Sequence, residues 1–158
     1  MDEEYRAYTV GQAKRYMQHI RSLNHSVRML RSEIDELRDM AGGLSGIDYA
    51  RPQVRTSPSA DAVPNAVIRI DSLASELEAE LSDYIAEKER AHRALAEVDG
   101  LYAELLAYRY LEGKSWADVA DALGYSEVHA RTVLHDDALA ALYPYLPHGW
   151  RDPVYPAI

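Results

Sequence analysis

The 158-residue chain contains no cysteine. This absence excludes disulfide bridges, thiolate metal sites and catalytic cysteine chemistry. No apolar run approaches the roughly 20 residues that a membrane-spanning helix needs. The first residues, MDEEYRAYTV, are acidic and lack the basic start and apolar core of a secretory signal. We therefore expect a cytoplasmic protein with no membrane partner.

Strand patterns and internal repeats are also absent, and what is present is helical. Apolar residues make up 47% of the chain, which indicates a globular protein. From about Glu3 to Met40 they recur at steps of three and four, which predicts a long amphipathic helix. The members of this first stripe are Val10, Ala13, Met17, Ile20, Val27, Leu30, Ile34 and Leu37. Asn24 either lies buried on the stripe and fixes the register against a partner helix, or lies solvated at its edge.

A second long helix is expected from Pro64 to Val98. Its stripe keeps the same steps through Val67, Ile70, Ala74, Leu77, Leu81, Tyr84, Lys88, Ala91, Leu95 and Val98. Gly42, Gly43 and Gly46 are expected to end the first helix, and the connector 42–63 holds Pro52 and Pro58. This connector is either mobile or packed along the helices. Residues 1–98 therefore predict a long antiparallel helical hairpin with a loop at 42–63.

The last third of the chain predicts three shorter helices. Asp99 is a plausible cap for a helix over 101–111, which Gly113 ends, and Ser115 and Ser126 are caps for helices over 116–123 and up to Leu142. Gly124 stands where the turn between the last two needs a positive φ. Small and apolar residues mark where these two cross: Val119, Ala120, Leu123, Gly124, Tyr125, Ala130 and Val133. The segment Tyr108–Leu142 therefore predicts a helix-turn-helix within residues 99–146. The apolar tail 147–158 is expected to pack on the body or on a neighbouring subunit.

In a helix-turn-helix the second helix is the usual device for reading the DNA major groove. We call the helix capped by Ser126 and ending at Leu142 the reading helix. The predicted DNA contacts are Lys114, Ser115, Ser126, Glu127, His129, Arg131, Thr132 and His135. Arg131 is suited to guanine O6 and N7, and Glu127 either accepts from cytosine N4 or favours the helix dipole. Asp137 is expected to turn toward the body, and Asp136 to face solvent or a protein.

The charge distribution opposes DNA binding by the reading helix alone. The net charge is −9, of which residues 99–158 contribute −5 and residues 57–98 another −5, whereas residues 1–56 carry +1. Lys14, Arg21 and Arg28 are spaced by sevens and share one face of the first helix. They hold DNA phosphates, form a solvated face or pair with the acidic second helix, and we expect the pairing.

The sequence contains no complete enzyme motif. Gly113-Lys114-Ser115 resembles the end of a phosphate-binding loop, but Tyr108 occupies the position of the required earlier glycine. His129 and His135 are six residues apart, which does not place them together as metal ligands on one helix. We expect no catalysis, no metal site and no cofactor.

The C-terminal segment Leu105–Ser126, LLAYRYLEGKSWADVADALGYS, resembles region 4 of bacterial sigma factors through Arg109, Tyr110, Gly113 and Gly124, followed by Ala138-Leu139. The whole arrangement also resembles phage late-gene transcriptional activators of the RinA and ArpU type. The resemblance implies a DNA-binding transcriptional regulator of phage or prophage origin that contacts RNA polymerase. The sequence departs from that pattern in the reading helix, where EVHARTVLHDDAL holds one arginine and three acidic residues.

Together these features predict an all-α protein that binds double-stranded DNA and regulates transcription. A homodimer is expected, because it would present two reading helices to two half-sites. The alternative is a helical protein-interaction adaptor, for example one that binds RNA polymerase, with weak or no DNA affinity.

Overall fold

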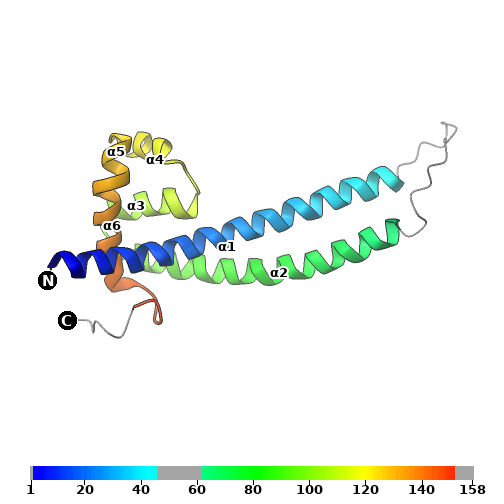
Figure 1. Ribbon diagram of the computed structural model, residues 1–158, viewed down its shortest axis with the longest axis horizontal. Coiled ribbons are helices and arrows are strands. Elements are labelled where there is room, and N and C mark those ends of the chain that lie inside the picture. Colours follow the sequence, from blue (N-terminus) through cyan, green and yellow to red (C-terminus); the bar gives the residue numbers. More distant parts are fainter. Residues whose placement is uncertain (1, 46–61, 152–158) are drawn as a thin grey trace. The chain divides into compact units, whose positions relative to one another are not determined.

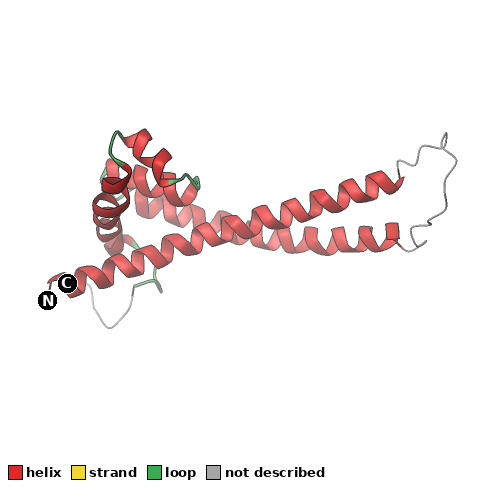
Figure 2. Ribbon diagram, turned by 45° about the horizontal axis from the view of Figure 1, so that its top comes forward, coloured by secondary structure: helices red, strands yellow, loops and turns green. Residues whose placement is uncertain are grey.

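The computed structural model describes residues 2–45 and 62–151 (Figure 1). Within these ranges every regular element is a helix and none is a strand (Figure 2). The predicted all-α class is therefore confirmed. In the same ranges, no helix combines the length and the apolar character required to cross a bilayer.

Two long helices occupy most of the chain up to Leu95. Helix α1 spans Asp2–Ser45 and α2 spans Ala62–Leu95. The expectation that Gly42 and Gly43 end the first helix is wrong, since α1 continues to Ser45. A glycine inside a helix costs only about 1 kcal/mol relative to alanine, so it weakens a helix without stopping it. Gly46 and the rest of the predicted connector, 46–61, lie outside the described residues.

The end of α2 also differs from the prediction. The helix stops at Leu95, and residues 96–98 continue in a tighter turn. There the amide of Glu97 donates to the carbonyl of Ala94 at 3.2 Å, and that of Val98 to Leu95 at 3.1 Å. Such bonds over three residues satisfy carbonyls that the end of an α-helix leaves unpaired.

The chain divides into two compact units. Unit 1 contains Met1–Asn24 and Tyr84–Ile158, and unit 2 contains His25–Asp83. Both long helices therefore contribute to each unit. Unit 1 also holds α3 (Gly100–Leu106), α4 (Trp116–Leu123), α5 (Glu127–His129) and α6 (His135–Leu142). Two π-helical turns, η1 (Ala107–Leu111) and η2 (Ala130–Leu134), and a 3-10 turn, η3 (Tyr143–Tyr145), complete it.

In unit 2, parts of α1 and α2 lie side by side. Its buried side chains among the described residues are Val27, Ile34 and Leu73, and Arg69 of α2 pairs with Glu33 of α1 at 3.4 Å. Two members of the predicted second stripe need correction: Leu73 is buried where Ala74 was expected, and Val67 is 48% exposed. A helix packed on a single neighbour buries a narrow seam, and Val67 lies about 120° around the helix from Leu73.

The core of unit 1 joins the N-terminal part of α1 to the C-terminal helices. Its largest fully buried side chains include Tyr16, Met17, Ile20, Leu105, Leu106, Leu139 and Leu142. The Tyr5 and Tyr8 rings meet the Tyr143 ring edge-on, and Arg6 pairs with Asp137. The prediction that Asp137 turns toward the body is thereby confirmed. Asn24 is half-buried, which fits the edge of the first stripe.

The described part of the tail packs on the body of its own chain. The Trp150 ring lies 5.3 Å from that of Tyr16 and 5.1 Å from that of His19. Arg151 donates to the carbonyl of Pro144 at 3.1 Å. Residues 147–151 therefore follow the first of the two predicted alternatives, and residues 152–158 lie outside the described part.

Candidate nucleic-acid interface

The segment from Ser115 to Leu142 places two helices across a tight turn. The hydroxyl of Ser115 accepts from the amide of Asp118, and that of Ser126 accepts from the amide of His129, each at 3.2 Å. Between them, Gly124 adopts a left-handed conformation with φ of 78°. Its amide donates a hydrogen bond to the carbonyl of Ala120, which ends α4. The predicted caps and the positive φ are therefore confirmed. Asp99, the third predicted cap, accepts from the amide of Leu101.

Small side chains let the two helices approach each other. Val119, Ala120 and Ala130 are buried, as the sequence predicted. Val133 is not part of this contact, because it is 49% exposed, and the buried residue is Leu134. Positions three and four after Ala130 both fall near its face of the helix, and the fourth, Leu134, takes the buried position.

Four side chains on the first turns of the reading helix are exposed to solvent. Glu127, Arg131 and Thr132 are exposed, as expected for groove contacts, and Val128 is 62% exposed. Val128 was not among the predicted contacts, although its position in the first turn pointed to it. Thr132 donates its hydroxyl hydrogen to the carbonyl of Val128 at 2.6 Å, and this bond fixes its rotamer.

The two histidines of the reading helix have different environments. His129 is half-buried and stacks on Tyr125, with ring centroids 5.5 Å apart. His135 is 6% exposed, so its prediction as a DNA contact needs correction. Because η2 rotates the start of α6 inward, the His135 ring meets the edge of Trp116 at 4.7 Å and shares a hydrogen bond of 2.7 Å with the Tyr110 hydroxyl.

This buried cluster carries shifted pKa values. Burial, together with the nearby charges of Lys14 and Arg109, lowers the pKa of His135 to about 4. Burial raises the pKa of Tyr110 to about 12. Both groups are therefore neutral near pH 7. Arg109 lies over the Trp116 ring at 4.9 Å, and burial and the charge of Arg21 lower its pKa. None of these roles was predicted from the sequence.

Lys114 and Ser115 directly precede α4, and Ser115 is its N-cap. The Lys114 ammonium lies 4.5 Å from the centre of the Tyr108 ring and 3.6 Å from a carboxylate oxygen of Glu112. The guanidinium of Arg109 donates to the Lys114 carbonyl at 3.0 Å. The backbone at the start of α4 is thus held by side-chain bonds, and the Lys114 amine is half-buried.

The three cations of the first helix fall in different units. Lys14 and Arg21 are exposed in unit 1, and Arg28 is exposed in unit 2. The charge of Lys14 contributes to the lowered pKa of His135, and that of Arg21 to the lowered pKa of Arg109. Among the described residues, none of the three forms an ion pair, including with α2. The described contacts therefore give no support to the expected pairing with the acidic helix.

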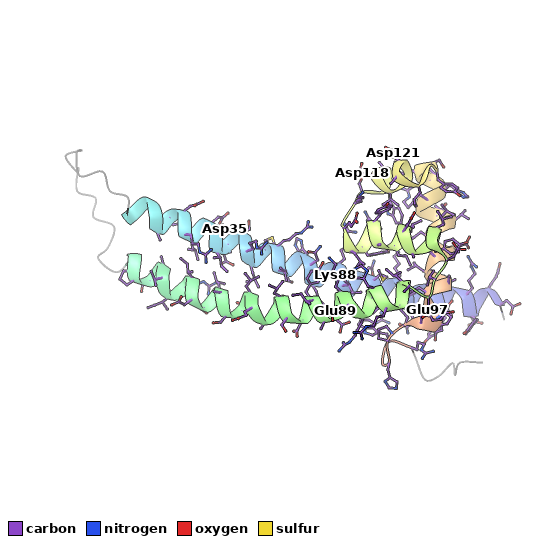
Figure 3. All side chains as sticks on the ribbon, turned by 180° about the vertical axis from the view of Figure 1, so that it is seen from behind. Asp35, Lys88, Glu89, Glu97, Asp118 and Asp121 are labelled. Atoms are coloured by element: carbon purple, nitrogen blue, oxygen red, sulfur yellow. The ribbon has the colours of Figure 1, made fainter. Side chains whose placement is uncertain are left out.

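Exposed carboxylates lie on α4 and at the start of α6. Asp118 and Asp121 point outward from α4 (Figure 3), and Asp136 is exposed, as predicted. In residues 2–45 and 62–151, no group of three acidic or histidine side chains is arranged to hold a metal ion.

No protein-family model matches this chain, and no curated protein or solved structure shows significant similarity to it. The function is therefore inferred from the residues and their geometry.

Proposed function

We propose that this protein is a cytoplasmic, non-enzymatic, DNA-binding transcriptional regulator of the phage late-gene activator type. In this proposal Ser115–Leu142 is a sigma-region-4-like helix-turn-helix that follows a long helical hairpin. The reading helix enters the major groove. The observation that carries the proposal is the exposure of Glu127, Val128, Arg131 and Thr132 on the first turns of that helix, directly after a left-handed glycine turn and a serine cap.

Three of the exposed side chains have a chemistry that suits a base edge. Arg131 is suited to paired hydrogen bonds with guanine, worth about 1–3 kcal/mol of discrimination. Val128 presents an apolar surface that suits the methyl group of thymine, and Glu127 suits the amino group of cytosine. His135 has no such role, because it lies in the core.

Positive charge from outside the reading helix supports the proposal. Lys14 and Arg21 are exposed, and neither forms an ion pair among the described residues; their charges lower the pKa values of His135 and Arg109, respectively. They can offset the −5 charge of residues 99–158 and contact phosphates. Lys114 and Ser115 add contacts at the start of α4.

A salt titration tests this function. Fluorescence anisotropy of the full chain with labelled duplex DNA from upstream of candidate promoters should show binding that weakens steeply between low and moderate salt. Arg131→Ala should weaken binding at least about five-fold on the preferred sequence. Arg93→Ala removes another exposed arginine of unit 1 and serves as the matched control. Equal losses in the two variants would contradict base reading by Arg131.

The exposed carboxylates favour a second function, a helical protein-interaction adaptor. Asp118, Asp121 and Asp136 would repel phosphates if DNA approached from their side. They suit a basic protein surface, for example on RNA polymerase. Absence of DNA binding at low salt, together with co-purification of RNA polymerase, would favour the adaptor.

The proposal includes a homodimer, which would present two reading helices to two half-sites. The exposed apolar side chains Val67 and Ile68 of α2 supply contact area for a second copy. Light scattering during size-exclusion chromatography measures the mass directly. A mass equal to that of one chain, at concentrations where DNA is bound, would contradict the dimer.

A further inference from the structure

A surface groove runs along the two helices of unit 2, away from the reading helix in sequence. Its volume is about 530 Å³. Side chains of α1 and α2 both line it, and those that carry the argument are Met29, Leu30, Glu33, Glu36, Glu76 and Glu80. We call it the acidic groove. None of its residues belongs to the proposed DNA-reading surface.

The floor of the acidic groove is apolar and incompletely covered. Leu30 is half-buried, and Met29 is 58% exposed. Among its described residues, unit 2 buries only Val27, Ile34 and Leu73, because two helices packed on each other shield a single narrow seam. An unbranched methionine adapts its shape to a partner, and exposed methionines are common on surfaces that bind helices.

Carboxylates from both helices line the groove. Glu33 pairs with Arg69 at 3.4 Å, whereas Glu36, Glu76 and Glu80 have no ion pair among the described residues. The exposed arginines Arg28 and Arg31 of α1 do not line the groove. Three like charges without partners around an apolar floor favour a cationic occupant, since each new ion pair relieves their mutual repulsion.

We propose that the acidic groove binds a basic amphipathic helix of another protein. A third helix laid between two packed helices buries its apolar face on Met29 and Leu30, as in other helix-in-groove complexes. Its lysines or arginines then reach Glu36, Glu76 and Glu80. A second copy of this chain fits less well, because a twofold axis would set two acidic grooves against each other.

The test uses the full chain and a fluorescein-labelled synthetic helix with leucines on one face and lysines on the other. The same peptide with glutamates in place of lysines is its control. Anisotropy should show tighter binding of the lysine peptide. Glu76→Gln combined with Glu80→Gln should weaken that binding about five-fold, the effect of roughly 1 kcal/mol from two partly exposed charges. Met29→Ala should weaken it about three-fold or more through lost apolar contact.

A matched variant separates the groove from the general negative charge of the chain. Asp35→Asn combined with Glu78→Gln removes one charge from each helix at positions that do not line the groove, and Asp35 is marked in Figure 3. This variant should retain binding within about two-fold. Equal weakening by the two double variants would overturn the proposal. So would a lack of preference for the lysine peptide, or self-association of the chain that Glu76→Gln and Glu80→Gln abolish.

Discussion

The hydroxyl of Tyr110 lies 2.7 Å from Nε2 of His135 and shares a hydrogen bond with it in the core of unit 1. Each residue belongs to or directly follows a π-helical turn, Tyr110 in η1 and His135 after η2. The bond links the helix before α4 to the reading helix, and the Trp116 ring of α4 packs against the same imidazole. The orientation of the reading helix therefore depends on this neutral pair.

Acid should destabilise the fold through His135. Its folded pKa is about 4, below the ordinary value of 6.5, because burial and the charges of Lys14 and Arg109 disfavour the imidazolium. Between pH 6.5 and 4 the unfolded state binds the proton and the folded state does not, so the free energy of unfolding falls as the pH falls. The loss should reach at most about 3 kcal/mol. Urea unfolding at a series of pH values measures it.

Two glutamine variants give the controls for this titration. His135→Gln should flatten the dependence between pH 6.5 and 4. His148→Gln replaces an exposed histidine of unit 1 and serves as the control. An unaltered slope in the first variant would show that other groups carry the acid sensitivity.

Removal of the Tyr110 hydroxyl should destabilise unit 1. In Tyr110→Phe the ring still fills its place, but Nε2 of His135 loses its partner in a buried environment. An unpaired buried polar group costs about 1–3 kcal/mol. Tyr108→Phe is the matched control, because Tyr108 is half-buried and its ring still lies under Lys114. Urea unfolding at pH 7 should show a large loss for the first variant and a small one for the second.

The turn at Gly124 should resist substitution. Gly124→Ala places a Cβ on a residue with φ of 78°, and this left-handed conformation costs a non-glycine residue about 1–2 kcal/mol. A Cβ at Gly124 meets no atom within 4 Å, so the cost comes from the backbone rather than from a clash. Gly100→Ala adds a methyl group to an equally open position without positive φ. Thermal unfolding should show destabilisation in Gly124→Ala only.

Phosphate contacts by the first helix should appear in the salt dependence of DNA binding. Lys14→Ala combined with Arg21→Ala should weaken binding to all duplexes alike and reduce the salt slope by about two. Arg131→Ala should instead weaken binding mainly on the preferred sequence. An unchanged salt slope in the double variant would remove Lys14 and Arg21 from the DNA-binding surface.

Local signals in the sequence were reliable where the chemistry is local. The caps at Asp99, Ser115 and Ser126 and the positive φ of Gly124 were all predicted and are all confirmed. A cap needs only its own side chain and an amide two or three residues away, and a left-handed turn needs only glycine. Gly42 and Gly43 were wrongly predicted to end α1, because a glycine weakens a helix by an amount that the neighbouring turns can offset.

Side-chain orientation was less predictable at the candidate site. His135 was expected to face DNA and lies in the core, Leu134 replaces Val133 in the contact, and Val128 was overlooked. Val128 lies before η2 and was missed although its place in the first turn indicated it, whereas His135 directly follows η2. A π-helical turn changes the direction in which the side chains after it point. A prediction that assumes the regular α-helical period does not include this change.

The sequence by itself determined that this protein is helical and where its short helices begin, because amphipathic spacing and caps act over a few residues. The tertiary structure decided which of its ionisable side chains are buried, paired or exposed. Packing buried His135 against Tyr110 and Trp116, engaged Asp137 with Arg6 and left Arg131 exposed. These outcomes depend on residues as much as 131 positions apart in the chain, and no local pattern contains them.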